Sequence, residues 1–292
     1  MVVATDVQFR SGPELCRGTL RMPSASDPVA AVVLCTGFAG TQDTPSIVAT
    51  AEAFAAAGFA ALTFDYRRFG TSDGSPRQMI RLDDQHRDVR AAIDHLRADD
   101  RVDSSRIALW GTSLGGAHVV VVASARTDVA AVIAQVPFNG FPRGSGGRSR
   151  RATARLLRAM VWDRLRTSLR LSPTYIRAVG KPESTSVMAS LGATEAIDGM
   201  ASATWQNRVA PGVLFDMMRY RPAEAAAKLL VPLLVCVAAD DREAPAELVD
   251  ELVTAARHGR SSRYPVGHFD VYRPEIRAQL IEDQIAFLRE VL

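Results

Sequence analysis

The chain has 292 residues, of which 47% are hydrophobic and 23% are charged, and its formal net charge is +3 at pH 7. This balance is typical of a globular protein. A chain of this length buries a core without needing disulfides or metals as supports. A net charge so close to zero gives no reason to expect nucleic acid as a partner.

Three cysteines, Cys16, Cys35 and Cys236, form an odd set without paired spacing, and each lies in a short apolar run. A disulfide framework is therefore not expected, in keeping with a reducing compartment. Residues 1–6 lack the basic and long apolar regions of a signal peptide. No stretch approaches the roughly 20 apolar residues of a membrane span. We expect a cytoplasmic protein without a membrane span.

The elements begin with two alternating segments, 7–10 and 15–22, on either side of Ser-Gly-Pro, which predict a hairpin. A continuous apolar run at 30–35 then predicts a strand buried on both faces. Strands are next expected at 59–66, 106–110, 129–136, 229–237 and 262–266, and helices at 46–57, 83–97, 114–125, 247–257 and 276–292. This alternation predicts an α/β fold with a mostly parallel central sheet, helices on both faces and the hairpin as an antiparallel edge.

Residues 138–222 interrupt the alternation, with helical patches at 153–169 and 211–218 and no clear strand of the parallel sheet. We interpret them as a helical cap inserted into a core formed by 1–137 and 223–292. Ten arginines occur at 143, 148, 150, 151, 155, 158, 164, 166, 170 and 177, followed by Lys181, and the only acid between 141 and 181 is Asp163. Such a run indicates a solvated helix face or a docking surface for an acidic partner.

The strongest chemical signal is Gly111-Thr112-Ser113-Leu114-Gly115-Gly116, between an expected strand and an expected helix. A serine at such a sharp turn takes a strained conformation, and glycines two residues on either side relieve the crowding. Ser113 would be exposed at the start of the helix. There the helix dipole and the Leu114 amide would face an oxyanion.

A serine nucleophile needs a base. His86 and His95 lie on a charged helix and are expected at the surface, His118 is expected to be packed, and His258 ends a helix. His268 follows the last strand in a loop at the edge of the sheet where ligands bind, so it is the candidate base. Asp241 is the preferred acid to orient it, with Asp240 as the alternative, because both follow the strand at 229–237.

The order Ser113, Asp241, His268 resembles the α/β-hydrolase superfamily across the chain outside 138–222. The segments 64–72, 115–116 and 239–245 look most similar to its dienelactone-hydrolase-like and peptidase-S15-like branch. In that branch a proline commonly follows the acid by four residues, which selects Asp241 through Pro245.

The resemblance also bears on the loop after the strand at 30–35. It implies a second oxyanion donor there, which would be the Phe38 amide. This chain has Thr36 where many relatives have a histidine, and the departure puts the usual bracing of that loop in doubt. A buried pair of an aspartate and an arginine within 65–68 is expected to hold the loops around Ser113.

The chemistry predicts a carboxylic-ester hydrolase with Ser113 as nucleophile, His268 as base and Asp241 as orienting acid. The alternatives are a thioesterase or acyltransferase acting on acyl groups of coenzyme A or an acyl carrier protein, a peptidase, and a binding protein without activity. Bulky residues of the insertion are candidates for an acyl pocket: Trp162, Tyr175, Trp205, Phe215, Met217, Met218 and Tyr220. No metal-ligand spacing or nucleotide-binding loop is present, so we expect no cofactor.

Overall fold

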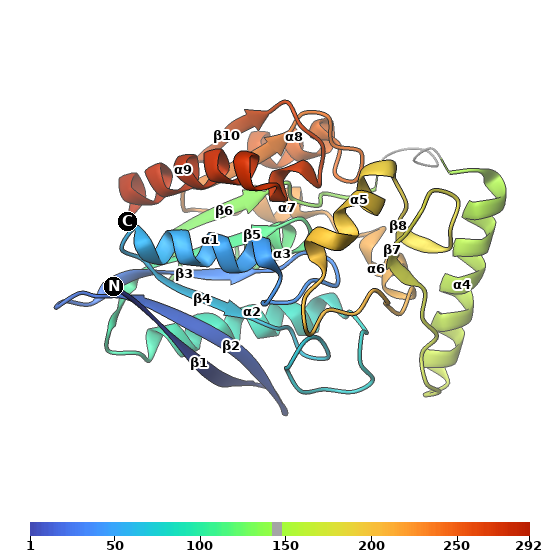
Figure 1. Cartoon of the computed structure of the whole chain (residues 1–292), viewed down its shortest axis with the longest axis horizontal. Helices are drawn as coiled ribbons and strands as arrows, with labels where there is room; N and C mark the ends of the chain where they lie inside the picture. Colours follow the sequence, from blue (N-terminus) through green and yellow to red (C-terminus); the bar gives the residue numbers. More distant parts are fainter. Residues whose placement is uncertain (142–147) are drawn as a thin grey trace.

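The computed structural model describes residues 1–141 and 148–292. Among these residues, the central sheet has eight strands in the order β1-β2-β4-β3-β5-β6-β9-β10 (Figure 1). Their bounds are β1 Val2–Ser11, β2 Glu14–Pro23, β3 Val29–Cys35, β4 Ala60–Phe64, β5 Val102–Thr112, β6 Ala131–Gln135, β9 Leu233–Ala238 and β10 Gly259–Tyr264. The β1–β2 hairpin pairs antiparallel with β4, and the remaining neighbours pair in parallel. The expected antiparallel edge is confirmed.

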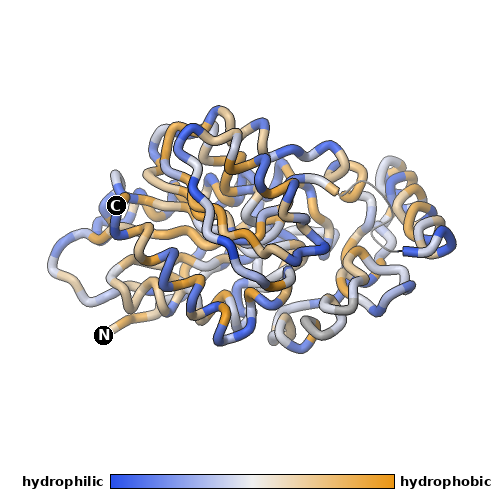
Figure 2. Tube along the Cα trace, turned by 90° about the horizontal axis from the view of Figure 1, so that it is seen from above, coloured by the Kyte–Doolittle hydropathy of each residue, from blue (hydrophilic) through white to orange (hydrophobic). Residues whose placement is uncertain are grey.

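Alternation along the buried strands sends side chains into two separate cores. Val32, Leu34 and Trp110 face the helices α1 (Pro45–Ala56) and α9 (Pro274–Val291). Val33 and Leu109 face the other side, which α2 (Leu82–Arg97), α3 (Leu114–Ala123) and α8 (Ala246–Ala255) cover. Figure 2 shows the apolar strands running through the middle of this arrangement. The predicted α/β-hydrolase fold, with helices on both faces of a mostly parallel sheet, is confirmed.

Several predicted strand bounds are wrong by three or more residues, since β1 begins at Val2 rather than at 7 and β5 begins at Val102 rather than at 106. The strand expected from 229 begins at Leu233, because 229–232 form an irregular connection after the short helix α7 (Pro222–Ala226) and its turn. The strand expected at 262–266 is β10, Gly259–Tyr264. This strand lies at the edge of the sheet and is largely exposed. Its polar sequence therefore lacks the apolar run that identifies the buried strands.

The insertion lies at the end of the molecule towards which the parallel strands point (Figure 1). Its helices are α4 (Arg150–Ser168), α5 (Leu191–Met200) and α6 (Val213–Met217). Two short strands, β7 (Arg177–Val179) and β8 (Ser186–Met188), pair in parallel with each other, apart from the central sheet. The sequence pattern does not reveal this small sheet, because each strand is only three residues long.

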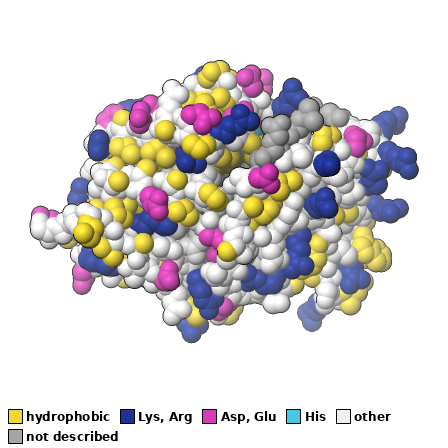
Figure 3. Space-filling model, viewed as in Figure 1, with side chains coloured by type: hydrophobic (Ala, Val, Ile, Leu, Met, Phe, Trp, Pro, Cys, Tyr) yellow, Lys and Arg dark blue, Asp and Glu magenta, His cyan; other side chains and the backbone are white. Residues whose placement is uncertain are grey.

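The arginines of the insertion are mostly exposed, and some of them also make contacts within it. Those at 150, 151, 155, 158, 170 and 177 are exposed, and Figure 3 shows basic side chains gathered at this end. The half-buried Arg148 donates to the carbonyls of Ser186 and Val187, and the exposed Arg164 forms an ion pair with Asp216 at 2.8 Å. Arg143 lies outside the described residues. Most of the run is thus a charged outer face, and four of its members also bond within the insertion, namely Arg148, Arg155, Arg164 and Arg166.

Within the described ranges, no helix combines the length and the apolar character needed to cross a membrane.

Candidate active site

Ser113 lies at the turn between β5 and α3, with φ +53°. This left-handed conformation is costly for a residue with a side chain. A Cβ on Gly111 would lie 2.3 Å from the carbonyl oxygen of Gly115, and a Cβ on Gly115 would lie 2.4 Å from that of Cys35. Both positions therefore require glycine. The close packing that excludes a side chain at each of them keeps the turn sharp.

The three side chains of the predicted triad form one hydrogen-bonded line. Nε2 of His268 lies 3.2 Å from Oγ of Ser113, and Nδ1 of His268 lies 2.7 Å from Oδ2 of Asp241. His268 is 5% exposed and Asp241 is 8% exposed, so water competes little for these bonds. They come from three separate loops, after β5, β9 and β10.

The local structure around Asp241 explains its position. The other oxygen of its carboxylate, Oδ1, accepts hydrogen bonds from the backbone amides of Glu243 at 2.8 Å and Ala244 at 2.7 Å. These bonds orient the carboxylate and leave Oδ2 for the imidazole. Asp240 is exposed, and its backbone amide donates to the carbonyl of Val266. Of the two candidate acids, only Asp241 is hydrogen-bonded to His268.

Two opposing effects act on the pKa of His268. Burial lowers the pKa, because the charged imidazolium loses its hydration. The negative charge of Asp241 and its hydrogen bond raise it, and they prevail, so the pKa lies above its ordinary value. The site therefore favours a proton on this imidazole more than water does. That is the property required of a base that must hold a proton briefly.

The residues predicted to supply oxyanion donors lie on either side of Ser113. Leu114 is the first residue of α3, where helix amides have no acceptor within the helix. Phe38 lies in the loop after β3, and a Cβ on its neighbour Gly37 would be 3.2 Å from Cβ of Ser113. The Thr36 hydroxyl donates to the carbonyl of Gly40 at 3.3 Å. This bond links the two ends of the loop at 36–40. Thr36 can therefore stabilise the loop without the histidine that many relatives have at this position.

A cavity of about 260 Å³ opens beside Ser113 and His268. Phe38, Ile47 and Phe269 contribute apolar walls from the core. The insertion contributes Met188 from β8 and Met200 from α5. None of the seven bulky residues proposed from the sequence lines it. Trp162 is 54% exposed and Met218 is 57% exposed.

His86 is buried, so its expected surface position is wrong. It is 7% exposed and lies with the fully buried His118 and with Tyr220, which comes from the turn between α6 and α7. Nε2 of His86 lies 2.8 Å from the hydroxyl oxygen of Tyr220, and Nδ1 of His118 lies 2.9 Å from it. Burial lowers the pKa of His86 to about 4, and the charge of Arg90 adds to this shift. The cluster of neutral groups joins the insertion to α2 and α3.

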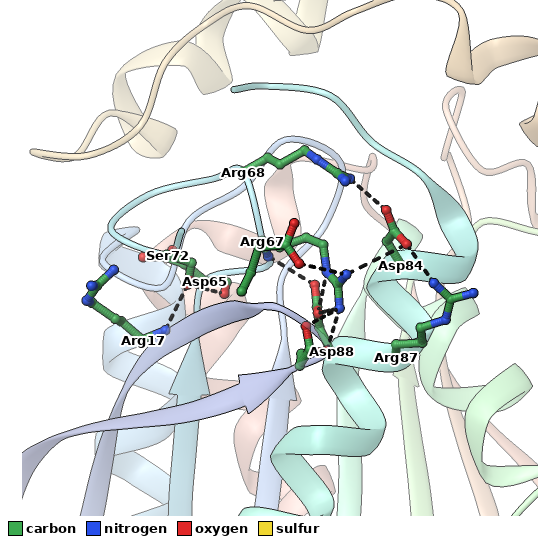
Figure 4. Close-up of polar contacts among 10 residues, drawn as sticks. Arg17, Asp65, Arg67, Arg68, Ser72, Asp84, Arg87 and Asp88 are labelled. Carbon is green, nitrogen blue, oxygen red and sulfur yellow. Dashed lines mark hydrogen bonds and ion pairs between the residues drawn. The ribbon is translucent and has the colours of Figure 1, made fainter. Parts of the chain in front are cut away.

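The 65–68 segment forms buried ion pairs, but not through Asp65. Arg67 pairs with Asp88 of α2 at 2.7 Å, and Arg68 pairs with Asp84 at 2.7 Å (Figure 4). Asp65 instead accepts from the backbone amides of Gln42 and Thr71, each at 2.9 Å. The expectation of an ion pair within the segment is therefore wrong. Its arginines hold the loop to α2, and its aspartate holds two neighbouring loops.

Comparison with known proteins agrees with this fold. Residues 26–266 match a family of hydrolases described as serine aminopeptidase, S33. The chain is 32% identical to the quorum-quenching protein AidA of Acinetobacter baumannii (strain MDR-ZJ06), over 98% of this chain and 95% of that protein. It is 28% identical to the thiohydrolase apmlB of Arthrinium phaeospermum, over 80% of each.

Among solved structures, the α/β hydrolase GrgF from Penicillium sp. sh18 superimposes with a TM-score of 0.81 at 22% identity, over 99% of both chains. This likeness concerns the fold. The match to the family model covers most of the chain, and the relative at 32% identity spans nearly all of it. The chain belongs to the serine aminopeptidase S33 family of α/β hydrolases.

Proposed function

We propose that the protein is a serine hydrolase that cleaves carboxylic esters through an acyl-enzyme, with Ser113, His268 and Asp241 as its catalytic triad. The single observation that supports this best is the buried line of hydrogen bonds from Asp241 through His268 to Ser113. A nucleophile, a base and an orienting carboxylate within hydrogen-bond distance are the arrangement that acyl transfer to serine requires.

In the first half of the reaction, Oγ of Ser113 attacks the ester carbonyl carbon while Nε2 of His268 takes the hydroxyl proton. The amides of Leu114 and Phe38 hold the negative oxygen of the tetrahedral intermediate. His268 then gives the proton to the leaving alcohol oxygen as the bond from carbon to that oxygen breaks. Asp241 keeps the imidazole in the required tautomer and stabilises its charged form.

In the second half, a water molecule attacks the acyl-enzyme and His268 takes one of its protons. The second tetrahedral intermediate collapses, the proton passes to Oγ of Ser113, and the carboxylic acid leaves. Residues 138–222 act in this scheme as a cap over the core of 1–137 and 223–292. Met188 and Met200 of the cap face the same cavity as Ser113, which supports this division and favours a small apolar acyl or alcohol group.

A thioester substrate is the second candidate. The relative named thiohydrolase favours it, and the exposed arginines of α4 offer a surface for an acidic carrier or for coenzyme A. The same three residues would perform this reaction, since only the leaving group changes. The narrower resemblance to dienelactone-hydrolase-like and peptidase-S15-like enzymes rests on sequence segments alone and remains a prediction.

Turnover of matched substrates tests the proposal. Wild-type protein and Ser113→Ala would each be given p-nitrophenyl butyrate, a butyryl thioester, a lactone and a short peptide anilide. Ester turnover that Ser113→Ala abolishes would support the proposal, and a clear preference for the thioester would favour the second candidate. A folded wild-type protein that turns over none of these compounds would favour a binding protein without activity.

A further inference from the structure

A chain of buried polar side chains runs from the core of the sheet to the candidate active site. The indole Nε1 of Trp110 donates to Oε1 of Gln284 at 3.0 Å, and Nε2 of Gln284 donates to Oε1 of Gln135 at 2.9 Å. Nε2 of Gln135 donates to Oγ1 of Thr112 at 3.3 Å. Oγ1 of Thr112 lies 2.7 Å from the hydroxyl oxygen of Tyr272. This series of hydrogen bonds thus ends at the phenol of Tyr272, which is bonded to the residue that precedes Ser113.

The indole of Trp110 fixes the direction of the three bonds from Trp110 to Thr112. An indole N–H can only donate, so the amide oxygen of Gln284 must face it and the amide nitrogen must face away. Gln284 therefore donates to Gln135, which orients the second amide in the same sense. Gln135 in turn must donate to Thr112, so one acceptor site of the Thr112 hydroxyl is already in use.

Two arrangements then remain for the last bond. If Tyr272 donated to Thr112, the hydroxyl hydrogen of Thr112 would have no acceptor among the described residues, and Thr112 is only 2% exposed. A buried hydrogen left without an acceptor is costly. If Thr112 donates to Tyr272, the buried hydroxyl hydrogen of Thr112 has an acceptor. The Tyr272 hydroxyl hydrogen is then the one that has no acceptor among the residues that the structure describes.

Tyr272 is well placed to use this hydrogen. It lies in the short 3₁₀ helix Asp270–Tyr272, four residues after His268, and it lines the same cavity as Ser113 and Phe269. Burial and the charge of Asp241 raise the pKa of Tyr272, and the hydrogen bond with Thr112 opposes them only in part. The phenol therefore stays neutral and keeps its hydrogen at the pH values at which the imidazole of His268 acts as a base.

We propose that Tyr272 is a specificity-determining residue whose hydroxyl donates to an acceptor oxygen of the substrate, set within a few bonds of the scissile carbonyl. The class of substrate this favours is an ester with an ether, hydroxyl or carbonyl oxygen in the part that occupies the cavity. An all-alkyl ester leaves the hydrogen unused. The inference rests on the proposed function, because it concerns selection among substrates of Ser113.

The test compares pairs of esters that differ only in one oxygen. p-Nitrophenyl methoxyacetate is paired with the butyrate, and the 3-methoxypropionate with the pentanoate. The measured quantity is the ratio of kcat/KM for the ether ester to that for its alkyl partner, and the ratio of each variant is compared with that of the wild type. The intrinsic reactivity of each ester cancels in this comparison.

Tyr272→Phe removes the hydrogen, and we expect it to lower the ratio about tenfold for at least one pair, the usual effect of one neutral hydrogen bond. Thr112→Val should lower it in the same direction, whereas Thr112→Ser, which can still accept and donate, should keep it. Tyr175→Phe is the matched control. Tyr175 donates to the carbonyl of Arg77 at 2.8 Å and does not line the cavity, so its variant should keep the wild-type ratio.

An unchanged ratio in Tyr272→Phe for both pairs would overturn the inference, as would an equal loss for ether and alkyl esters. If Tyr272→Phe does not fold, the contrast between Thr112→Ser and Thr112→Val decides by the same ratio. The proposed function fails separately, through the absence of any Ser113-dependent turnover of the alkyl esters by the wild-type protein.

Discussion

Nδ1 of His268 lies 2.7 Å from Oδ2 of Asp241, on the opposite side of the imidazole ring from Ser113. The side chain of the neighbouring Asp240 is exposed, and its backbone amide donates to the carbonyl of Val266, which follows β10. Asp241 is thus buried and bonded to the imidazole, whereas Asp240 is exposed. The effects of substituting these two adjacent carboxylates can therefore be compared within one loop.

Asp241→Asn should lower kcat for ester hydrolysis about 10⁴-fold, the loss that follows when the equivalent change in a serine-protease triad stabilises the wrong tautomer. Asp240→Asn is its matched control and should retain activity within about twofold, since the side chain is exposed. Steady-state kinetics on one ester measures both. Equal losses in the two variants, or a larger loss in Asp240→Asn, would contradict the assignment of the acid.

The raised pKa of His268 predicts the pH dependence of the reaction. The base must be neutral to accept the proton of Ser113, so kcat/KM should fall as the pH drops through the pKa of His268. This acid limb should lie above the ordinary histidine value. Because Asp241 causes the upward shift, the limb should move to lower pH in the residual activity of Asp241→Asn. A limb that does not move would argue that another group is titrating.

In the loop that carries Phe38, position 37 has no room for a side chain, because Gly37 packs closely on Ser113. Gly37→Ala would bring a Cβ to 3.2 Å from Cβ of Ser113 and to 3.3 Å from the carbonyl oxygen of Thr112. The loop must then shift by a few tenths of an ångström, which would weaken the contact that we propose between the Phe38 amide and the oxyanion. We expect kcat to fall about 10–100-fold, somewhat less than for the loss of a whole oxyanion donor. Thermal melting serves as the check that the variant is folded.

The buried ion pair between Arg67 and Asp88 should matter for stability rather than for chemistry. Asp88 is fully buried, and its removal leaves the Arg67 guanidinium without its nearest carboxylate. Asp88→Ala should therefore lower the free energy of unfolding by about 3 kcal/mol, as measured by urea denaturation. Glu290→Gln, which removes the exposed partner of Arg260, is the control and should leave the transition where it is. Equal effects in the two variants would contradict this account.

The fold could be predicted because its signals are local. Continuous apolar runs identify β3, β6 and β9, and amphipathic spacing identifies α2. The glycines at 111 and 115 reveal the turn at Ser113, because the same crowding that requires them recurs wherever a strand turns sharply into a helix. The choice of Asp241 over Asp240 depended on the resemblance through Pro245, since both carboxylates follow the same strand.

The features that the sequence does not predict depend on contacts between residues far apart in the chain. Trp110 and Gln284 are 174 positions apart, and His86 and Tyr220 are 134 apart. No pattern around His86 distinguishes a buried histidine from an exposed one, because acidic and basic residues surround it in the sequence. The residues of the insertion that line the cavity, Met188 and Met200, depend on how short elements pack. Their sequences carry no periodic signal.

We assign the role of nucleophile to Ser113, and covalent labelling is a direct test of this claim. A fluorophosphonate would be incubated with wild-type protein, Ser113→Ala and His268→Ala, and the intact mass of each would be measured. We predict one adduct on the wild type, none on Ser113→Ala, and a strongly slowed adduct on His268→Ala, because the hydroxyl has lost its base. Labelling that persists in Ser113→Ala, or a folded wild-type protein that forms no adduct, would contradict the claim.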